Sequence, residues 1–239
     1  MPLIKHVLLA VTVVITAGCA SLPAGHTEDP RDPWERYNRA VFEFNDGVDR
    51  AVLKPVAEVY RDYVPDVIQT ALRNFFGNLR DIATALHQFL QGKPDQAGTA
   101  VARVAINTTI GILGLADPAS DLGFRKTSED FGQTLGVWGA GPGPYFVLPL
   151  LGPSTVRDTL GFVVDVMADP RDLVIDGAAA QNIARGLIAI DRRRELLDSE
   201  TTLRALSFDR YMGTRDAWLA RRRSQVYDGD PPPLPFKDQ

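Results

Sequence analysis

The chain has 239 residues and a formal net charge of −4 at pH 7, from 26 Lys and Arg against 30 Asp and Glu. This length forms one large domain or two small ones, and the weakly acidic balance argues against nucleic acid as a partner. A single cysteine, Cys19, excludes an internal disulfide and a metal site built from cysteines.

The N-terminal 18 residues have the composition of a secretory signal. A short charged start at Lys5 and His6 precedes an apolar run, and small residues stand directly before Cys19. This resembles a lipobox, after which the cysteine is lipidated, and Ala20 in place of aspartate resembles the signal for release to the outer membrane. We therefore predict a lipoprotein signal peptide over 1–18, lipidation of Cys19 and a flexible tether over 19–31.

The first helix is predicted to start at Asp32-Pro33-Trp34-Glu35, where Asp32 caps the helix and Glu35 completes a capping box. Its apolar residues recur at helical spacing along one face: Trp34, Tyr37, Val41, Phe44, Val48 and Ala51. Asn38 and Asn45 lie beside that face, seven residues apart. They mark either the shoulder of a core helix or the lining of a polar path, and spacing alone favours the first interpretation.

The rest of the chain predicts helices and no strands. Lys54-Pro55 and Val64-Pro65 are expected to break the chain, because the residue before a proline leaves the helical region. Apolar periodicity then predicts helices over 55–63, 65–76, 80–91, 95–113, 155–168, 173–197 and 201–227. The expected fold is an all-α single domain over 32–227, followed by a disordered tail over 228–239.

One irregular stretch interrupts this helical pattern, between Asp130 and Asp158. It contains six glycines and four prolines in an otherwise apolar segment, and Pro149 argues against a central strand. A second apolar run extends from Ile110 to Ala116. Such segments are hard to place in a water-soluble core, and they suit the wall of a cavity or a membrane interface.

Catalytic and cofactor signatures are absent from the sequence. There is no Gly-x-Ser-x-Gly elbow, phosphate loop or dinucleotide fingerprint, and the acidic residues are scattered. Within the predicted domain His87 is the single histidine, so we interpret it as structural. We predict no enzyme, no cofactor and no metal site.

Two long motifs resemble the VacJ/MlaA family of outer-membrane phospholipid-transport lipoproteins. They are Asp32-Pro33-Trp34-Glu35-x-x-Asn38-Arg39-x-x-Phe42-x-Phe44-Asn45-x-x-x-Asp49 and Gly141-x-Gly143-Pro144-Tyr145-x-x-Leu148-Pro149-x-x-Gly152-Pro153-Ser154-Thr155-x-Arg157-Asp158. A looser similarity involves Asp209, Tyr211, Arg215 and Arg222, so the resemblance extends over most of the predicted domain.

The resemblance implies a ring-like helical domain embedded in one leaflet, lipid-anchored on the periplasmic side of the outer membrane of a Gram-negative bacterium. Such a protein sits beside a trimeric porin. It extracts mislocalised phospholipids from the outer leaflet through an amphipathic channel, and it passes them to a soluble periplasmic lipid carrier, which maintains lipid asymmetry.

By the same resemblance, the channel gate comprises Asn38, Phe42, Phe44 and Asn45. Gly141, Gly143, Pro144, Tyr145 and Pro149 shape the channel wall or only the fold. Two other functions compete with transport: a non-transporting scaffold that docks the porin, and a lipid-modifying enzyme.

Overall fold

A computed structural model describes residues 29–205 and 209–233, so the predicted signal peptide and Cys19 lie outside the described residues. Its elements are α2 (Glu35–Val48), the π-helical turn η1 (Asp49–Leu53), α3 (Lys54–Tyr63), α4 (Asp66–Leu90), α5 (Pro94–Thr109), α6 (Pro118–Asp121), α7 (Phe131–Val137), β1 (Tyr145–Leu148), β2 (Gly152–Thr155), α8 (Val156–Met167), the 3-10 turn η2 (Pro170–Leu173), α9 (Ala178–Ala205) and α10 (Arg210–Val226). The all-α prediction is confirmed, and the one exception is a two-stranded antiparallel hairpin.

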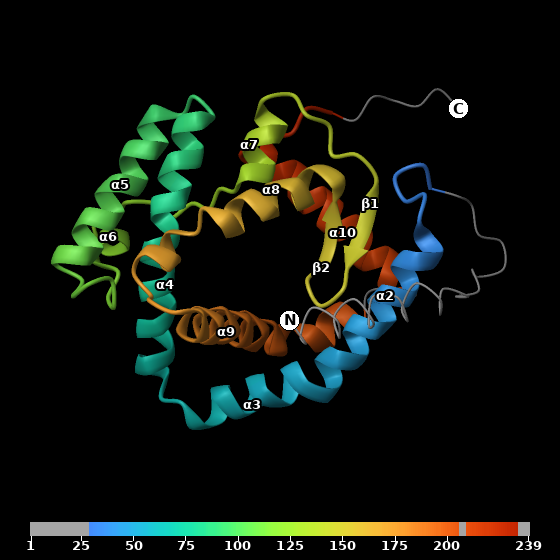
Figure 1. Cartoon of the computed structure of the whole chain (residues 1–239), viewed down its shortest axis with the longest axis horizontal. Coiled ribbons are helices and arrows are strands. Elements are labelled where there is room, and N and C mark those ends of the chain that lie inside the picture. The colour runs from blue at the N-terminus through green and yellow to red at the C-terminus, as the bar shows by residue number, and fades with distance from the viewer. Residues whose placement is uncertain (1–28, 206–208, 234–239) are drawn as a thin grey trace.

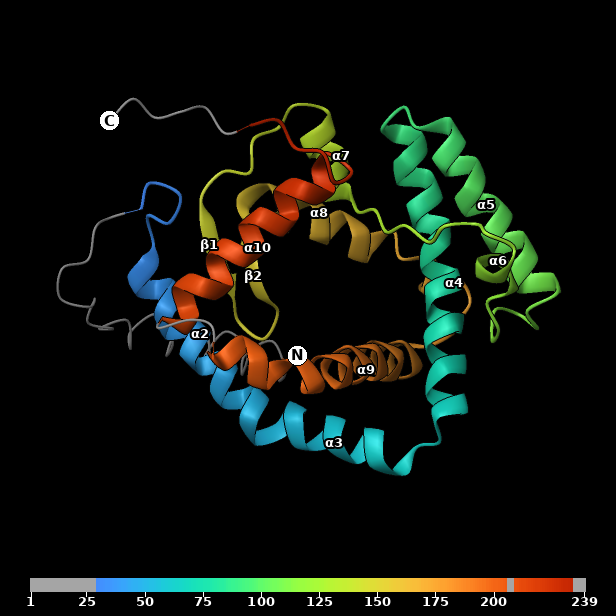
Figure 2. The ribbon, with the colours of Figure 1, turned by 180° about the vertical axis from the view of Figure 1, so that it is seen from behind.

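The elements follow one another around a ring (Figure 1). The helices α2, α3 and α4 form one part of its outline, and α8, α7, α10 and the hairpin form the rest. In both views α9 runs along α3 on the side toward the centre of the ring (Figures 1 and 2). The helices α5 and α6 lie outside the ring, against α4. The ring-like arrangement expected from the sequence is therefore observed.

Proline breaks the chain at only one of the two expected places. Val64 is extended, with ψ 123°, so the break before Pro65 is confirmed. Lys54 stays helical, and α2 continues through η1 into α3. The π turn widens the backbone just before Pro55, whose ring would otherwise clash with the carbonyl four residues earlier. The predicted break at Lys54-Pro55 is wrong for this reason.

Three helix boundaries also differ from the predictions. The two helices expected over 65–76 and 80–91 are one 25-residue helix, α4, because Asn78 is buried and donates to Thr108 Oγ1 rather than ending the helix. The helix expected from residue 173 begins at Ala178, after η2. The last helix begins at Arg210, where the side chain of Asp209 accepts from the backbone N–H of Met212.

The capping prediction for α2 is also wrong. Its N-cap is Trp34, which makes no side-chain capping bond. Asp32 is instead buried, and Glu35 forms an ion pair with Arg39 at 2.7 Å. These carboxylates serve tertiary contacts, which compete with local capping.

The distribution of apolar residues is inverted relative to a water-soluble protein. Among the described residues, buried polar and charged side chains outnumber buried hydrophobic ones. A small apolar cluster contains Val41, Tyr145, Val147 and Tyr211. Large hydrophobic side chains are exposed along α3, α4, the end of α5 and α8, including Tyr63, Phe89, Ile112 and Met167. Polar groups are therefore concentrated in the joints of the ring, and much of its apolar surface is exposed.

The crossing of α7 and α8 depends on two glycines. A Cβ at Gly161 would lie 2.3 Å from the backbone nitrogen of Gly132, far below any real contact. The helices can approach this closely only because neither residue has a side chain, and this contact fixes one joint of the ring.

Candidate functional site

Two asparagines of α2 hold the hairpin. The buried side chain of Asn38 accepts from the backbone N–H of Val147 at 2.8 Å and donates to the carbonyl of Tyr145 at 3.2 Å. Asn45 donates to the carbonyl of Leu148 at 2.9 Å and accepts from the N–H of Leu150 at 2.7 Å. Each amide therefore satisfies one donor and one acceptor of an unpaired strand edge.

The spacing of the two asparagines matches the spacing of the strand. Seven helical residues rise about 10.5 Å at 1.5 Å per residue. Three residues of extended chain, from Tyr145 to Leu148, whose carbonyls accept from the two amides, span about 10 Å. A helix with amides seven residues apart thus fits a strand edge at two points, and this pairing makes α2 and the hairpin one unit.

The hairpin pairs Tyr145 with Thr155 and Leu148 with Gly152. Pro149 lies in the turn, just outside β1, so it removes no bond between the strands. Leu150 adopts φ 64°. The side chains of Leu150 and Leu151 are both exposed. The N–H of Leu150 that Asn45 holds therefore belongs to a residue in an unfavourable conformation, so Asn45 stabilises the turn where it is most strained.

The structure brings together three of the four predicted gate residues. Asn38, Phe42 and Asn45 lie on the same face of α2, since they are four and seven residues apart. Phe42 packs edge-on against Tyr211 of α10, with ring centroids 5.7 Å apart. Phe44 points away from this face and is 41% exposed.

The predicted wall residues divide into two groups. Gly141 is exposed, with open space where a side chain would begin, and Gly143 adopts φ 69°, which suits glycine. Tyr145 is fully buried in the apolar cluster, where burial and the charge of Asp32 raise the pKa of its hydroxyl. Pro144 precedes β1, and its carbonyl accepts from the N–H of Val156. Pro144 and Tyr145 therefore belong to the joint between hairpin and helices.

A buried ionic network joins α10 to the start of α2. Arg215 is 2% exposed and contacts Asp32 at 3.2 Å and Asp29 at 3.1 Å. The hydroxyl of Tyr211 also donates to Asp32, and burial together with this bond raises the pKa of Tyr211. Asn38 donates to the other oxygen of Asp32 at 2.7 Å. One carboxylate thus links α10 to the asparagine that holds the hairpin.

A second network joins α10 to α7 and α8. Arg222 donates to both oxygens of Asp130, at 2.7 and 2.9 Å, and to Asp158 at 2.8 Å. Burial by itself raises the pKa of Asp130, but the hydrogen bond and charge of Arg222 outweigh it, and the pKa is lowered to about 2. Asp130 also caps α7. The guanidinium of Arg222 is therefore paired with carboxylates inside the protein.

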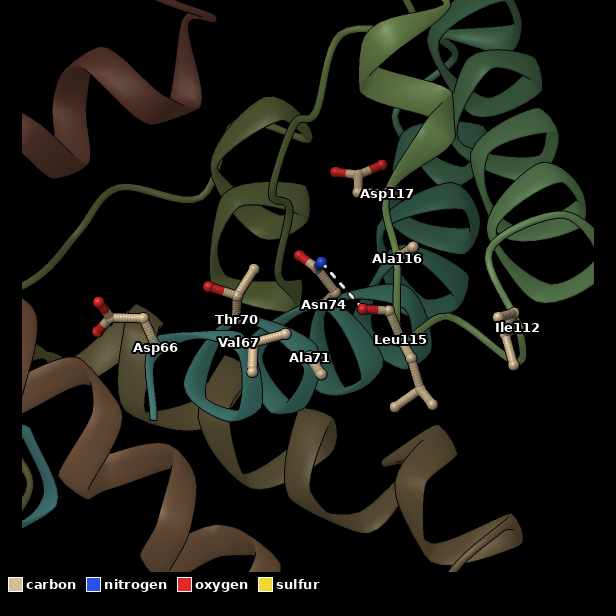
Figure 3. Close-up of a pocket in the computed structure, with 9 residues that line it drawn as sticks. All are labelled: Asp66, Val67, Thr70, Ala71, Asn74, Ile112, Leu115, Ala116 and Asp117. Atoms are coloured by element: carbon tan, nitrogen blue, oxygen red, sulfur yellow. Dashed lines mark hydrogen bonds between the residues drawn. The ribbon is translucent and has the colours of Figure 1, made fainter. Parts of the chain in front are cut away.

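The second apolar run, Ile110 to Ala116, directly follows α5 and forms the turn at its end, the tip of α5. Ile112 and Leu113 are consecutive residues with positive φ, 54° and 57°, and about 70% of each side chain is exposed. A groove of about 510 Å³ lies between this tip and the first turns of α4. In Figure 3 the side chains of Val67, Ala71 and Leu115 lie along it, and Asn74 donates to the carbonyl of Leu115.

No catalytic arrangement is found among the described residues. His87 Nε2 lies 3.1 Å from Asp165, and its Nδ1 lies 3.3 Å from Thr134, so it joins α4 to α7 and α8. The hydroxyl of Ser154 bonds to Thr159 rather than to a histidine. The described part of the chain has no group of three or more metal-ligating side chains.

Within residues 29–205 and 209–233, no single helix is long and apolar enough to cross a membrane. The segments Val156–Leu173 and Ala178–Leu197 meet the length and composition criteria only together, and they are bent by 110°.

A family described as MlaA lipoprotein matches residues 30–225 of the chain. The chain belongs to the MlaA lipoprotein family. The "Intermembrane phospholipid transport system lipoprotein MlaA" of Shigella flexneri is 36% identical over 221 residues, which cover 89% of this chain and 85% of the relative. The protein of the same name from Haemophilus influenzae is 30% identical over 230 residues, covering 94% and 92%.

A solved structure supports the fold of this MlaA-family chain. It is reported as the "Structural basis for maintenance of bacterial outer membrane lipid asymmetry", and it is 34% identical to this chain with a TM-score of 0.74. The match covers 82% of this chain and 98% of the solved one. The fold of this chain is therefore shared with a protein that is also related to it by sequence.

Sequence reasoning missed how the site is assembled. It placed Asn38 and Asn45 beside the apolar face of a helix, but their partners are backbone groups more than 100 residues later. It also gave no sign that Arg193, within the run Arg192-Arg193-Arg194, pairs with Asp49 of η1 at 2.7 Å. The seven-residue spacing of two asparagines was the available signal for the first contact.

Proposed function

We propose that this chain is the outer-membrane lipoprotein of an intermembrane phospholipid transport system. In this role it removes mislocalised phospholipids from the outer leaflet and so maintains lipid asymmetry. The observation that carries the proposal is the inverted distribution of side chains. A ring whose joints bury polar networks and whose surface exposes Tyr63, Phe89 and Met167 is stable only where an apolar medium covers those side chains. Its relatives are named for this transport.

The seating in the membrane follows from the same surface. Lipidation of Cys19 supplies the anchor, since each buried methylene contributes about 0.8 kcal/mol to membrane attachment. The exposed apolar side chains of α3, α4 and α8 then lie in one leaflet. The chain lies in the periplasmic-side leaflet, beside a trimeric porin, and delivers lipid to a soluble periplasmic carrier.

The gate in this proposal is the unit formed by α2 and the hairpin. Asn45 holds the strained Leu150, and the exposed Leu150 and Leu151 form the hairpin tip. Phe42 and Asn38 connect the same face of α2 to α10 and Asp32. A substitution at Asn45 frees the hairpin tip while leaving the buried bonds of Asn38 in place. Gly141, Gly143, Pro144, Tyr145 and Pro149 set the path of the chain around this unit.

Transfer is tested with the lipidated full-length protein in vesicles that contain a labelled phospholipid. We expect the label to pass to the soluble carrier only when the lipoprotein is present. In cells, deletion of Asn45 is expected to raise outer-leaflet phospholipid at normal protein levels. Cys19→Ala is expected to leave unprocessed precursor, visible as a shift on a gel.

The same experiments separate the competing functions. Crosslinking to porin without any lipid transfer would support the non-transporting scaffold instead. Turnover of the labelled phospholipid into a new product would support an enzyme and contradict the proposal.

A further inference from the structure

The orientation of α9 places one arginine on its inner side. Asp191 and Glu195 pair with Arg73 of α4, at 3.2 and 3.3 Å, which fixes one side of α9 against the ring. Arg194 lies 3.9 Å from Asp66, where α3 meets α4. Successive helical residues are about 100° apart, so Arg192 is on nearly the opposite side of α9 from Arg194. The helix α9 runs along α3 on the side toward the centre of the ring (Figures 1 and 2). The helical spacing therefore orients Arg192 away from α3.

Arginines on three further elements act on Arg192 through their positive charges. Arg80 lies seven residues after Arg73 and so on nearly the same face of α4, the face that contacts α9. Arg171 lies in η2, which packs against α4, and its guanidinium is paired with Asp169. Arg221 lies on α10. Arg80, Arg192 and Arg221 are exposed, and none of them makes an ion pair or hydrogen bond with another residue that the structure describes.

The charges of these arginines act on one another. The pKa of Arg192 is lowered by burial and by the positive charges of Arg80, Arg171 and Arg221, while Glu195 alone acts in the other direction. Yet the side chain of Arg192 is exposed. A group that is both solvent-exposed and surrounded by protein lies in a concave place, where like charges are poorly screened and an anion is attracted.

We infer that Arg80 and Arg192 form an anion site on the inner side of the ring that binds the phosphate of a phospholipid headgroup. Guanidinium groups suit this ligand, because their planar donors match two phosphate oxygens at once. The site gives a passing headgroup a defined position between α4 and α9. The inference rests on the proposed transport of phospholipids and names the part of the lipid that the chain recognises.

The test uses the full-length lipoprotein in a maltoside detergent, which carries no phosphate. Binding is measured by titration at low salt for three probes: an oleoyl lysophospholipid, the monoglyceride with the same acyl chain, and inorganic phosphate. The variants are the double substitution Arg80→Gln and Arg192→Gln, the charge-keeping Arg192→Lys, and Arg125→Gln as the control. Arg125 is an exposed arginine in the connection between α6 and α7.

We expect the double variant to bind the lysophospholipid about tenfold more weakly and the monoglyceride as before, since only the phosphate loses its charged partners. Arg192→Lys should keep most of the affinity, and Arg125→Gln all of it. An unchanged affinity of the double variant for lysophospholipid would overturn the inference, as would binding of free phosphate as tightly as the lipid. If the wild type binds both lipids equally, only the anion site fails, whereas binding of neither lipid contradicts the proposed function.

Discussion

The hairpin and the tip of α5 are the two apolar segments that interrupt the helical sequence, and the protein treats them in opposite ways. Both are held by asparagine side chains on backbone groups, Asn38 and Asn45 for the hairpin and Asn74 for the tip. The hairpin buries Tyr145 and Val147 completely. The tip instead exposes its large apolar side chains. Similar composition thus serves an internal joint in one place and an outward-facing surface in the other.

The largest expected effect comes from breaking the network behind the hairpin. Arg215→Met leaves Asp32 and Asp29 without their buried partner, and we expect a loss of about 3–5 kcal/mol in the free energy of unfolding. The matched control is Arg210→Met on the same helix, which removes the more exposed pair with Asp46 and should cost at most about 1 kcal/mol. Urea titration in detergent measures both, and equal losses would contradict the comparison.

The asparagines test the joint against the tip directly. Asn38→Ala should cost about 2–3 kcal/mol, because it leaves the buried groups of Val147 and Tyr145 without partners. Asn45→Ala should cost about 1 kcal/mol and increase amide hydrogen exchange at Leu150. Asn74→Ala removes the bond from α4 to the exposed tip and should lower the free energy of unfolding by about 0.5 kcal/mol. A loss for Asn74→Ala as large as that for Asn38→Ala would remove the distinction.

Acid should loosen both regions together. Asp117 lies at the base of the tip. Burial by itself raises the pKa of Asp117, but hydrogen bonds from Ser120, Arg103 and Asn107 outweigh burial and lower this pKa to about 2. The pKa of Asp130 is lowered to the same value. A carboxylate with a depressed folded pKa contributes stability above its usual pKa of 3.8, and that contribution is lost as pH falls toward 2.

Each of these carboxylates should therefore contribute about 2 kcal/mol at pH 6, and most of it should vanish by pH 2. Unfolding titrations across this range measure the change. Asp117→Asn should flatten the profile, whereas a profile that stays as steep in this variant would show that the loss arises elsewhere.

The smallest expected effect is a gain in stability at the tip. Ile112 is a β-branched residue at φ 54°, so Ile112→Gly should raise the free energy of unfolding by about 0.5 kcal/mol while weakening attachment to phospholipid vesicles. Val101→Gly, at an exposed position inside α5, should lower it by about 1 kcal/mol. Vesicle flotation and thermal unfolding measure the two properties. Unchanged flotation of Ile112→Gly would contradict a membrane role for the tip.

Local signals in the sequence predicted the helices well where the chain obeys local rules. The extended Val64 before Pro65 and the positive φ of Gly92 after α4 follow from proline and glycine chemistry alone. Pro55 did not break the chain, because a π turn absorbed it. That outcome depends on how α2 and α3 pack into the ring, which no local pattern records.

The candidate site was predicted as a set of residues and not as an assembly. The two family-like motifs identified Asn38, Asn45 and Tyr145 from residue types and order alone. Their mutual contacts join segments over 100 residues apart, and the strand edge that they satisfy was hidden by the glycines and prolines around it. Asp32 illustrates the same limit, because its position suggested a helix cap while its partners, Tyr211 and Arg215, lie at the other end of the chain.

The π turn between α2 and α3 sets the rotation of one helix relative to the next. A π turn already carries one more residue than the α-helical turn it replaces, so inserting a further residue within Asp49–Leu53 would rotate α2 by about 100° about its axis relative to α3. Both asparagines would then face away from the hairpin, although neither had been mutated. Single-residue insertions in this five-residue window are therefore expected to be far less tolerated than substitutions there.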